Sequence, residues 1–131
     1  MIRARRGAAA IEFGLTLPIL TLFVLAVIEY GWLFSQQTAV LYAVRDGTRV
    51  AVTFSADDAE SEAVDHVERV LAGFGVDCGQ VTCQTFTTLA GGAGSRTLRV
   101  LTSLPYDALT GMVPVPSTLS AEMTMMMEDQ D

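Results

Sequence analysis

The fold of this chain is decided by residues 6–34, which read RGAAAIEFGLTLPILTLFVLAVIEYGWLF. No charged side chain occurs from Phe13 to Ile28, and no other part of the chain is as long and as apolar. A helix over Ala8–Phe34 would be roughly 40 Å long, against about 30 Å for the hydrocarbon core of a bilayer. The stretch therefore predicts a helix that spans a membrane, with residues 10–32 inside it.

The two ends of this span carry different residues. Three arginines and no acid precede it, which under the positive-inside bias places the N-terminus in the cytoplasm and residues from 35 onward outside. Aromatic side chains, which favour the membrane interface, stand at the other end. A secretory signal peptide would instead have a shorter apolar region followed by a cleavage site with small residues. The arginines are Arg3, Arg5 and Arg6, and the aromatic residues are Tyr30, Trp32 and Phe34.

Glu12 is a carboxylate one turn into the apolar run, where an acid would cost up to about 2.5 to 3.5 kcal/mol at mid-membrane. It therefore needs a partner. In one interpretation it is a first-turn acid that the helix dipole and Arg5 or Arg6 stabilise. In the other, cleavage after Gly7 gives Ala8 a free ammonium, and this cation neutralises Glu12 of the same chain or of a neighbouring one.

The order of these features resembles the prepilin cleavage signal of type IV pilin-like proteins: a basic leader, Gly7, four residues, Glu12 and a long apolar helix. Further motifs make residues 3–52 similar to the TadE-like family, minor pilins or pseudopilins of the bacterial tight-adherence (Tad) pilus. The related TadF and TadG proteins share much of this region. The motifs are Phe13, Leu17-Pro18, Glu29-Tyr30-Gly31 and Val44-Arg45-Asp46-Gly47-Thr48-Arg49.

This resemblance implies a processing event and a set of partners. A prepilin peptidase would cut after Gly7 and N-methylate Ala8, and residues 1–7 would be a leader. The mature chain would sit in the bacterial inner membrane as a single-pass protein, with Glu12 and Phe13 at contacts to other pilins. Its role would lie in pilus assembly, surface adhesion and biofilm formation.

The charge of the chain limits its partners. The net charge is −7, and removal of the three leader arginines would leave 5 arginines against 15 acids. Nucleic acid is therefore not expected as a partner. The chain contains no lysine, which excludes a phosphate-loop lysine and a Schiff-base lysine.

The helix is expected to continue through residues 35–54, because no proline or turn cluster occurs before Ser55. Small and apolar residues fall on one stripe at spacings of three and four. Gly47 costs about 1 kcal/mol relative to Ala in a helix, which indicates close approach of another backbone. That backbone belongs either to the chain's own globular part or to a neighbouring subunit. The stripe is Val40, Ala43, Gly47, Ala51 and Phe54, and Tyr42, Arg45 and Arg49 lie on another face.

Residues 55–131 are predicted to form a small extracytoplasmic domain, which makes the fold class α+β. Asp57 is the expected N-cap of a helix over residues 57–72. Three strands in an antiparallel sheet follow, with this helix or the upper part of the long helix on their apolar face. The strands are expected at 81–87, 97–104 and 119–127, with a hairpin loop at 91–94, one helical turn at 107–109 and methionines as core filler.

The chemistry-bearing residues of this domain predict a structural role. Cys78 and Cys83 lie outside the cytoplasm, where a disulfide is favoured; zinc would need four ligands, and the only other candidate is a distant histidine. That residue, His66, is expected to be solvated, and Asp107 and Glu122 are isolated carboxylates. We therefore expect no enzyme activity, no metal and no cofactor. The alternative function is an uncleaved single-pass membrane protein whose outer domain binds a partner or ligand.

Overall fold

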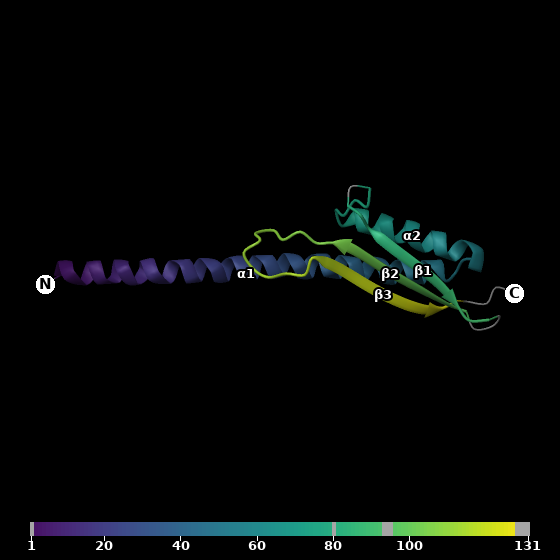
Figure 1. Ribbon diagram of the computed structural model, residues 1–131, viewed down its shortest axis with the longest axis horizontal. Helices are drawn as coiled ribbons and strands as arrows, with labels where there is room; N and C mark the ends of the chain where they lie inside the picture. Colours follow the sequence, from purple (N-terminus) through teal and green to yellow (C-terminus); the bar gives the residue numbers. More distant parts are fainter. Residues whose placement is uncertain (1, 80, 93–95, 128–131) are drawn as a thin grey trace. The chain divides into compact units, whose positions relative to one another are not determined.

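The computed structural model describes residues 2–79, 81–92 and 96–127, with the side chains of residues 2–6 and 8 excepted. A long helix and a second helix precede a three-stranded antiparallel sheet (Figure 1). The predicted α+β class is thereby confirmed. The elements are α1 (Ile2–Ala51), α2 (Ala56–Gly73), β1 (Gln84–Ala90), β2 (Thr97–Pro105) and β3 (Thr118–Met126).

The chain divides into two compact units. The first unit contains the residues up to Leu33 together with Ala108–Val115, and the second contains Phe34–Asp107 and the residues from Pro116 onward. Helix α1 contributes to both units, so a single element carries the apolar run and also part of the core of the second unit. It begins at Ile2, before the Ala8 start that was expected, because Arg and Ala are strong helix formers and Gly7 costs only about 1 kcal/mol.

The sheet of the second unit has the order β1-β2-β3 with antiparallel neighbours. Alternate residues of the central strand are buried, as a period of two predicts. The first strand begins at Gln84 and not at Val81, because the preceding residues form a turn. In that turn the Val81 amide donates to the Asp77 carbonyl (2.9 Å) and the Cys83 amide to the Val81 carbonyl (2.8 Å). The buried residues of β2 are Leu98, Val100, Thr102 and Leu104.

Helix α2 begins two residues earlier than the predicted N-cap implies. Ser55 has extended backbone (φ −62°, ψ 155°), and its carbonyl accepts the amide of Ala59 at 2.8 Å. Asp57 as N-cap is therefore wrong, because the change from extended to helical backbone occurs at Ser55. At the other end, Gly75 takes a positive φ of 82°, and the Val76 amide returns to the Leu71 carbonyl at 3.0 Å.

The core of the second unit is formed where the end of α1, α2 and the sheet meet. Gly47 lies against α2: a Cβ there would be 2.5 Å from Val67 Cγ2 and 3.3 Å from the Ala63 carbonyl oxygen. The backbone that approaches Gly47 is therefore the chain's own α2. Phe54 does not continue the buried stripe and is 38% exposed, because α1 ends at Ala51. The buried residues of the two helices are Ala39, Val40, Ala43, Val44 and Ala51 in α1 and Ala59, Ala63, Val67 and Leu71 in α2.

Two connections complete the fold. The predicted helical turn at 107–109 is wrong, since residues 106–117 contain no helix; the amide of Leu109 instead donates to a side chain of α1. The hairpin loop predicted at 91–94 follows β1, with Gly91 at a positive φ of 105°. Part of that loop, residues 93–95, lies outside the described residues.

Candidate functional site

The first half of α1 exposes its large apolar side chains. Ile19 is 73% exposed and Leu15 is 70% exposed, and most other large apolar residues from Ile11 to Phe34 are exposed too, with Leu25 and Leu33 half-buried. Residues Ala9–Ala51 contain a window long and apolar enough to cross a membrane. A contiguous apolar surface of this size marks contact with lipid or with other apolar helices. This surface is the candidate functional site.

The sequence-predicted processing residues lie at the start of this surface. Gly7 is exposed inside the helix, with no atom within 4 Å of the place where a Cβ would stand. Phe13 is 63% exposed, and Glu12 beside it is also exposed. The backbone of Ala8 is helical, and its side chain lies outside the described part of the chain. Because helical side chains lean toward the N-terminus, we expect the Glu12 side chain to lean toward the preceding turn.

A second acid, Glu29, closes the other end of the apolar run and is fully buried. Its Oε1 accepts the backbone amide of Leu109 at 2.7 Å. Its Oε2 accepts both the amide and the hydroxyl of Thr110, each at 2.7 Å. Next to it, the Tyr30 hydroxyl donates to the Pro114 carbonyl at 3.2 Å. All of these residues belong to the first unit, so Glu29 fastens residues 108–115 to α1.

Hydrogen bonds between a carboxylate and backbone amides are short and strong, since one partner is charged. Glu29 accepts two such bonds from backbone amides and a third hydrogen bond from the hydroxyl of Thr110. In the sequence Glu29 stands out only as part of a family motif, and this role was not predicted. The position of Glu29 was a signal for it, because an acid at the border of an uncharged run needs a partner, as Glu12 does. The identity of the partner could not be read, since it lies 80 residues away.

Comparison with protein families assigns the N-terminal region to a family. Residues 7–49 match the family of TadE-like proteins. The N-terminal region is TadE-like. The resemblance predicted from the sequence is thus confirmed over a range that contains Gly7, Glu12, Glu29 and Gly47. Comparison with curated proteins found no match, and comparison with solved structures found none either.

The TadE-like region and the long apolar helix fit a membrane-anchored protein, and the family match suggests one that is associated with the Tad pilus. The matched range ends at residue 49, two residues before α1 ends. The sheet, α2 and residues 108–115 therefore lie outside it. Glu29 connects the matched range to residues outside it, because it lies in the TadE-like region and binds the segment 108–115 that follows β2.

Two polar pairs in the second unit show that the predictions for His66 and Glu122 were wrong. His66 is not a solvated surface residue: its side chain is 20% exposed, and its Nε2 lies 2.8 Å from Asp46 Oδ2 in the TadE-like region. Asp46 and His66 thus join α1 to α2. Glu122 is not isolated either, because Arg99 donates from Nε to Oε1 (2.7 Å) and from a terminal nitrogen to Oε2 (2.8 Å).

The Arg99–Glu122 pair crosses from β2 to β3 on the exposed face of the sheet. The hydrogen bond from Arg99 holds the pKa of Glu122 below its ordinary value of 4.5. The same bond raises the pKa of Arg99. Both groups are open to solvent, so water and salt screen their attraction. Asp107, the other carboxylate that was predicted to be isolated, is exposed.

Cys78 and Cys83 form a disulfide, with their Cα atoms 5.2 Å apart. It closes the turn between α2 and β1. Closure of so short a loop stabilises the fold by about 2 kcal/mol in the chain-entropy description. The pair is therefore a structural element of the second unit.

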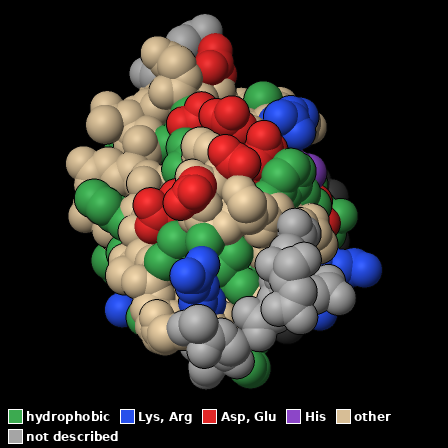
Figure 2. All heavy atoms as spheres, turned by 90° about the vertical axis from the view of Figure 1, so that its right-hand side faces the viewer, with side chains coloured by type: hydrophobic (Ala, Val, Ile, Leu, Met, Phe, Trp, Pro, Cys, Tyr) green, Lys and Arg blue, Asp and Glu red, His purple; other side chains and the backbone are tan. Residues whose placement is uncertain are grey.

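The second unit carries an acidic surface. Figure 2 shows acidic side chains gathered on the face that it displays. Helix α2 accounts for much of this charge, because it contains six acids and one arginine; two of the acids, Asp57 and Asp58, lie in its first turn. Such a face repels anionic partners, in line with the expectation that nucleic acid is not bound.

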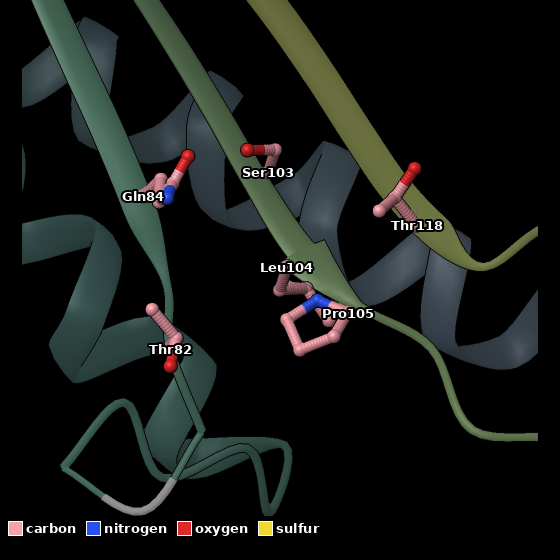
Figure 3. Close-up of a pocket in the computed structure, with 6 residues that line it drawn as sticks. All are labelled: Thr82, Gln84, Ser103, Leu104, Pro105 and Thr118. Carbon is pink, nitrogen blue, oxygen red and sulfur yellow. The ribbon is translucent and has the colours of Figure 1, made fainter.

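A hollow lies at one end of the sheet, where residues of all three strands meet (Figure 3). Hydroxyl and amide groups line it, together with one leucine and one proline. Among the described residues that line it there is no acid, base or thiol. Its lining residues are Thr82, Gln84, Ser103, Leu104, Pro105 and Thr118.

Proposed function

We propose that this chain is a structural minor pilin or pseudopilin of a Tad-type pilus. The observation that carries the proposal is an exposed apolar helix, matched to the TadE-like family, that presents an exposed Glu12 five positions after Gly7. In this proposal the first half of α1 lies in the bacterial inner membrane and then packs against the corresponding helices of other pilins. The protein acts in pilus assembly, and through the pilus in surface adhesion and biofilm formation.

The proposed orientation places the N-terminus in the cytoplasm and the second unit outside. It is supported by the three arginines before the apolar run, which retain that end on the cytoplasmic side. The disulfide between Cys78 and Cys83 supports it too, because disulfides persist in oxidising compartments and are rare in the cytosol. The alternative of an uncleaved membrane protein has the same orientation and differs at the N-terminus.

The proposed processing step is cleavage after Gly7 by a prepilin peptidase, followed by N-methylation of Ala8. Gly7 is suited to this step, since glycine is the weakest helix former in this part of α1 and its lack of a side chain leaves the peptide bond accessible. Cleavage would create an ammonium on Ala8. In the assembled state Glu12 would pair with the Ala8 ammonium of a neighbouring subunit, which would remove the cost of an isolated carboxylate in an apolar environment.

We further propose that the chain is not an enzyme. His66 is engaged with Asp46, and Glu122 with Arg99, so these groups have structural partners that join neighbouring elements. The hollow at the end of the sheet is lined by neutral side chains. Other pilus components and the prepilin peptidase are the proposed protein partners.

The test is the intact mass of the protein extracted from the membrane. The proposal predicts the mass of a chain that begins at Ala8, increased by one methyl group. The Gly7→Leu variant should keep its leader, because a large side chain does not fit a tight protease site. Gly14→Leu is the matched control, since Gly14 also has open space at its Cβ position and lies beyond the cleavage site; it should be cut normally. An uncut wild-type chain, or normal cleavage of Gly7→Leu, would contradict the processing step.

A further inference from the structure

We propose that residues 108–115 form a second membrane contact, a loop that lies in the interfacial layer of the bilayer and is fastened there by Glu29. The segment reads ALTGMVPV and contains no charged residue. Two of its large apolar side chains face outward: Leu109 is 57% exposed and Met112 is 66% exposed. Exposed apolar side chains that adjoin the exposed apolar surface of α1 enlarge that surface, and a large exposed apolar surface marks contact with lipid or with another apolar partner.

The position of the loop along α1 follows from its hydrogen bonds. About 20 helical residues fill the hydrocarbon core, at a rise of about 1.5 Å each. If Ala9 to Ile28 fill it, Glu29 stands at its edge. Leu109 and Thr110 bind Glu29 directly, and Pro114 is bound by Tyr30 one residue further on. The loop is therefore held at the depth where hydrocarbon gives way to the headgroup layer.

The occupant of this surface is the bilayer, because the exposed side chains of the loop continue the exposed surface of the span. Ile28 is 48% exposed and Trp32 is 45% exposed, so apolar and amphipathic side chains of α1 flank the place where the loop is attached. Tryptophan and tyrosine favour this layer, and the loop brings apolar side chains to the same level. The backbone of a loop can be satisfied there by water, which the hydrocarbon core does not supply.

Glu29 has a specific task in this arrangement. An unpartnered carboxylate at the edge of the hydrocarbon would draw water toward the helix or shift the span. The two amides and the hydroxyl of the loop take the place of that water. The loop therefore shields Glu29, and Glu29 fixes the loop. The inference rests on the membrane anchoring of α1 and not on leader cleavage or on a role in the pilus.

The test uses tryptophan fluorescence of the full chain in phosphatidylcholine vesicles whose acyl chains carry bromine near the headgroups. The chain has one tryptophan, Trp32, which reports insertion of the span. Met112→Trp in a Trp32→Phe background reports the loop. Phe86→Trp in the same background is the control, because Phe86 is 57% exposed and lies on the sheet of the second unit. Aqueous acrylamide provides the opposite quencher.

The proposal predicts that brominated lipid quenches Trp32 and the Met112→Trp reporter to a similar extent, and at least threefold more than the Phe86→Trp reporter. Acrylamide should give the reverse order. Addition of Glu29→Gln to the Met112→Trp chain should lower its lipid quenching at least twofold, because an amide cannot accept all three hydrogen bonds. Thr110→Val, which removes only the hydroxyl, should give a smaller loss.

Other outcomes overturn the inference. A Met112→Trp reporter that acrylamide quenches and lipid does not would place the loop in water. A reporter that neither quencher reaches would show that a neighbouring chain covers it. Unchanged lipid quenching after Glu29→Gln would remove Glu29 as the fastening residue. Failure of lipid to quench Trp32 would refute the membrane anchoring and this inference together, whereas an uncut N-terminus would refute only the proposed processing.

Discussion

The two acids at the borders of the apolar run have the same side chain and opposite surroundings. Glu29 is fully buried and accepts three hydrogen bonds from Leu109 and Thr110. Glu12 is exposed, and among the described side chains none is hydrogen-bonded to it. This difference indicates that Glu29 stabilises the fold of the single chain. Glu29 is satisfied within its own chain, whereas the proposed partner of Glu12 is the Ala8 ammonium of a neighbouring subunit.

The two halves of α1 show the same contrast in their apolar residues. Before residue 34 most of the large apolar side chains are exposed, and from Ala39 to Ala51 small and medium residues are buried against α2 and the sheet. The glycines follow this division. Gly31 has open space around it, whereas Gly47 is in contact with Val67. One half of the helix is thus shaped for lipid or other helices, and the other half for its own domain.

The largest effect is expected from Glu29→Ala, which removes the carboxylate that is hydrogen-bonded within the chain. It removes three charge-assisted hydrogen bonds and leaves two amides without their acceptor, at a cost of about 3 kcal/mol. Because about 1.4 kcal/mol corresponds to a tenfold change in an equilibrium constant, the rate of amide hydrogen exchange at Leu109 and Thr110 should rise roughly 100-fold. Hydrogen exchange in detergent micelles measures this. Thr110→Val should show a smaller increase, and unchanged exchange in Glu29→Ala would mean that Glu29 does not hold the loop.

The contrast between Gly47 and Gly31 predicts opposite responses to the same substitution. Gly47→Ala places a methyl group 2.5 Å from Val67 Cγ2 and should destabilise the second unit by about 1 to 3 kcal/mol. Gly31→Ala meets no atom and should stabilise the helix by up to about 1 kcal/mol. Denaturant unfolding followed by circular dichroism compares the two variants. Equal effects would show that α1 and α2 do not pack as described.

Glu122 is a third acid for comparison, and it is paired with Arg99 on the solvent-exposed surface. Its substitution should change stability the least. Arg99 depresses its pKa below 4.5 in the folded protein. A depressed folded pKa adds stability above the unfolded pKa, and this stability is lost as pH falls through the folded value. The stability difference between wild type and Glu122→Gln should therefore be present at neutral pH, shrink as pH falls below about 4.5, and be reduced by salt at neutral pH. A difference that grows on acidification would contradict the pairing.

The sequence predicted the parts of this fold that depend on local pattern. The long uncharged run predicted α1, and the alternation of Leu98, Val100 and Thr102 predicted the central strand. What it missed depends on contacts between residues far apart. The start of β1 was misplaced because a turn closed by Cys78 and Cys83 consumes the first residues. The partner of Glu29 could not be read, since no pattern in residues 108–115 indicates which side chain its amides bind.

The polar pairs of the second unit show the same limit. His66 and Asp46 lie 20 residues apart, and their contact depends on how α2 packs across α1. Arg99 and Glu122 are 23 residues apart, and they meet because of the register of β2 and β3. In each case the residue was noticed in the sequence and judged isolated. The helix crossing and the strand register that join these residues are tertiary features.

The proposed pairing of Glu12 with another subunit is tested by the yield of processed Glu12→Gln that co-purifies with other pilus components. Glutamine keeps the shape and removes the charge, so the variant should insert in the membrane and lose its leader as wild type does. The account predicts that its co-purification and its support of piliation are largely lost, because the Ala8 ammonium of the neighbour has no counter-charge. Co-purification of processed Glu12→Gln at wild-type yield would contradict the account.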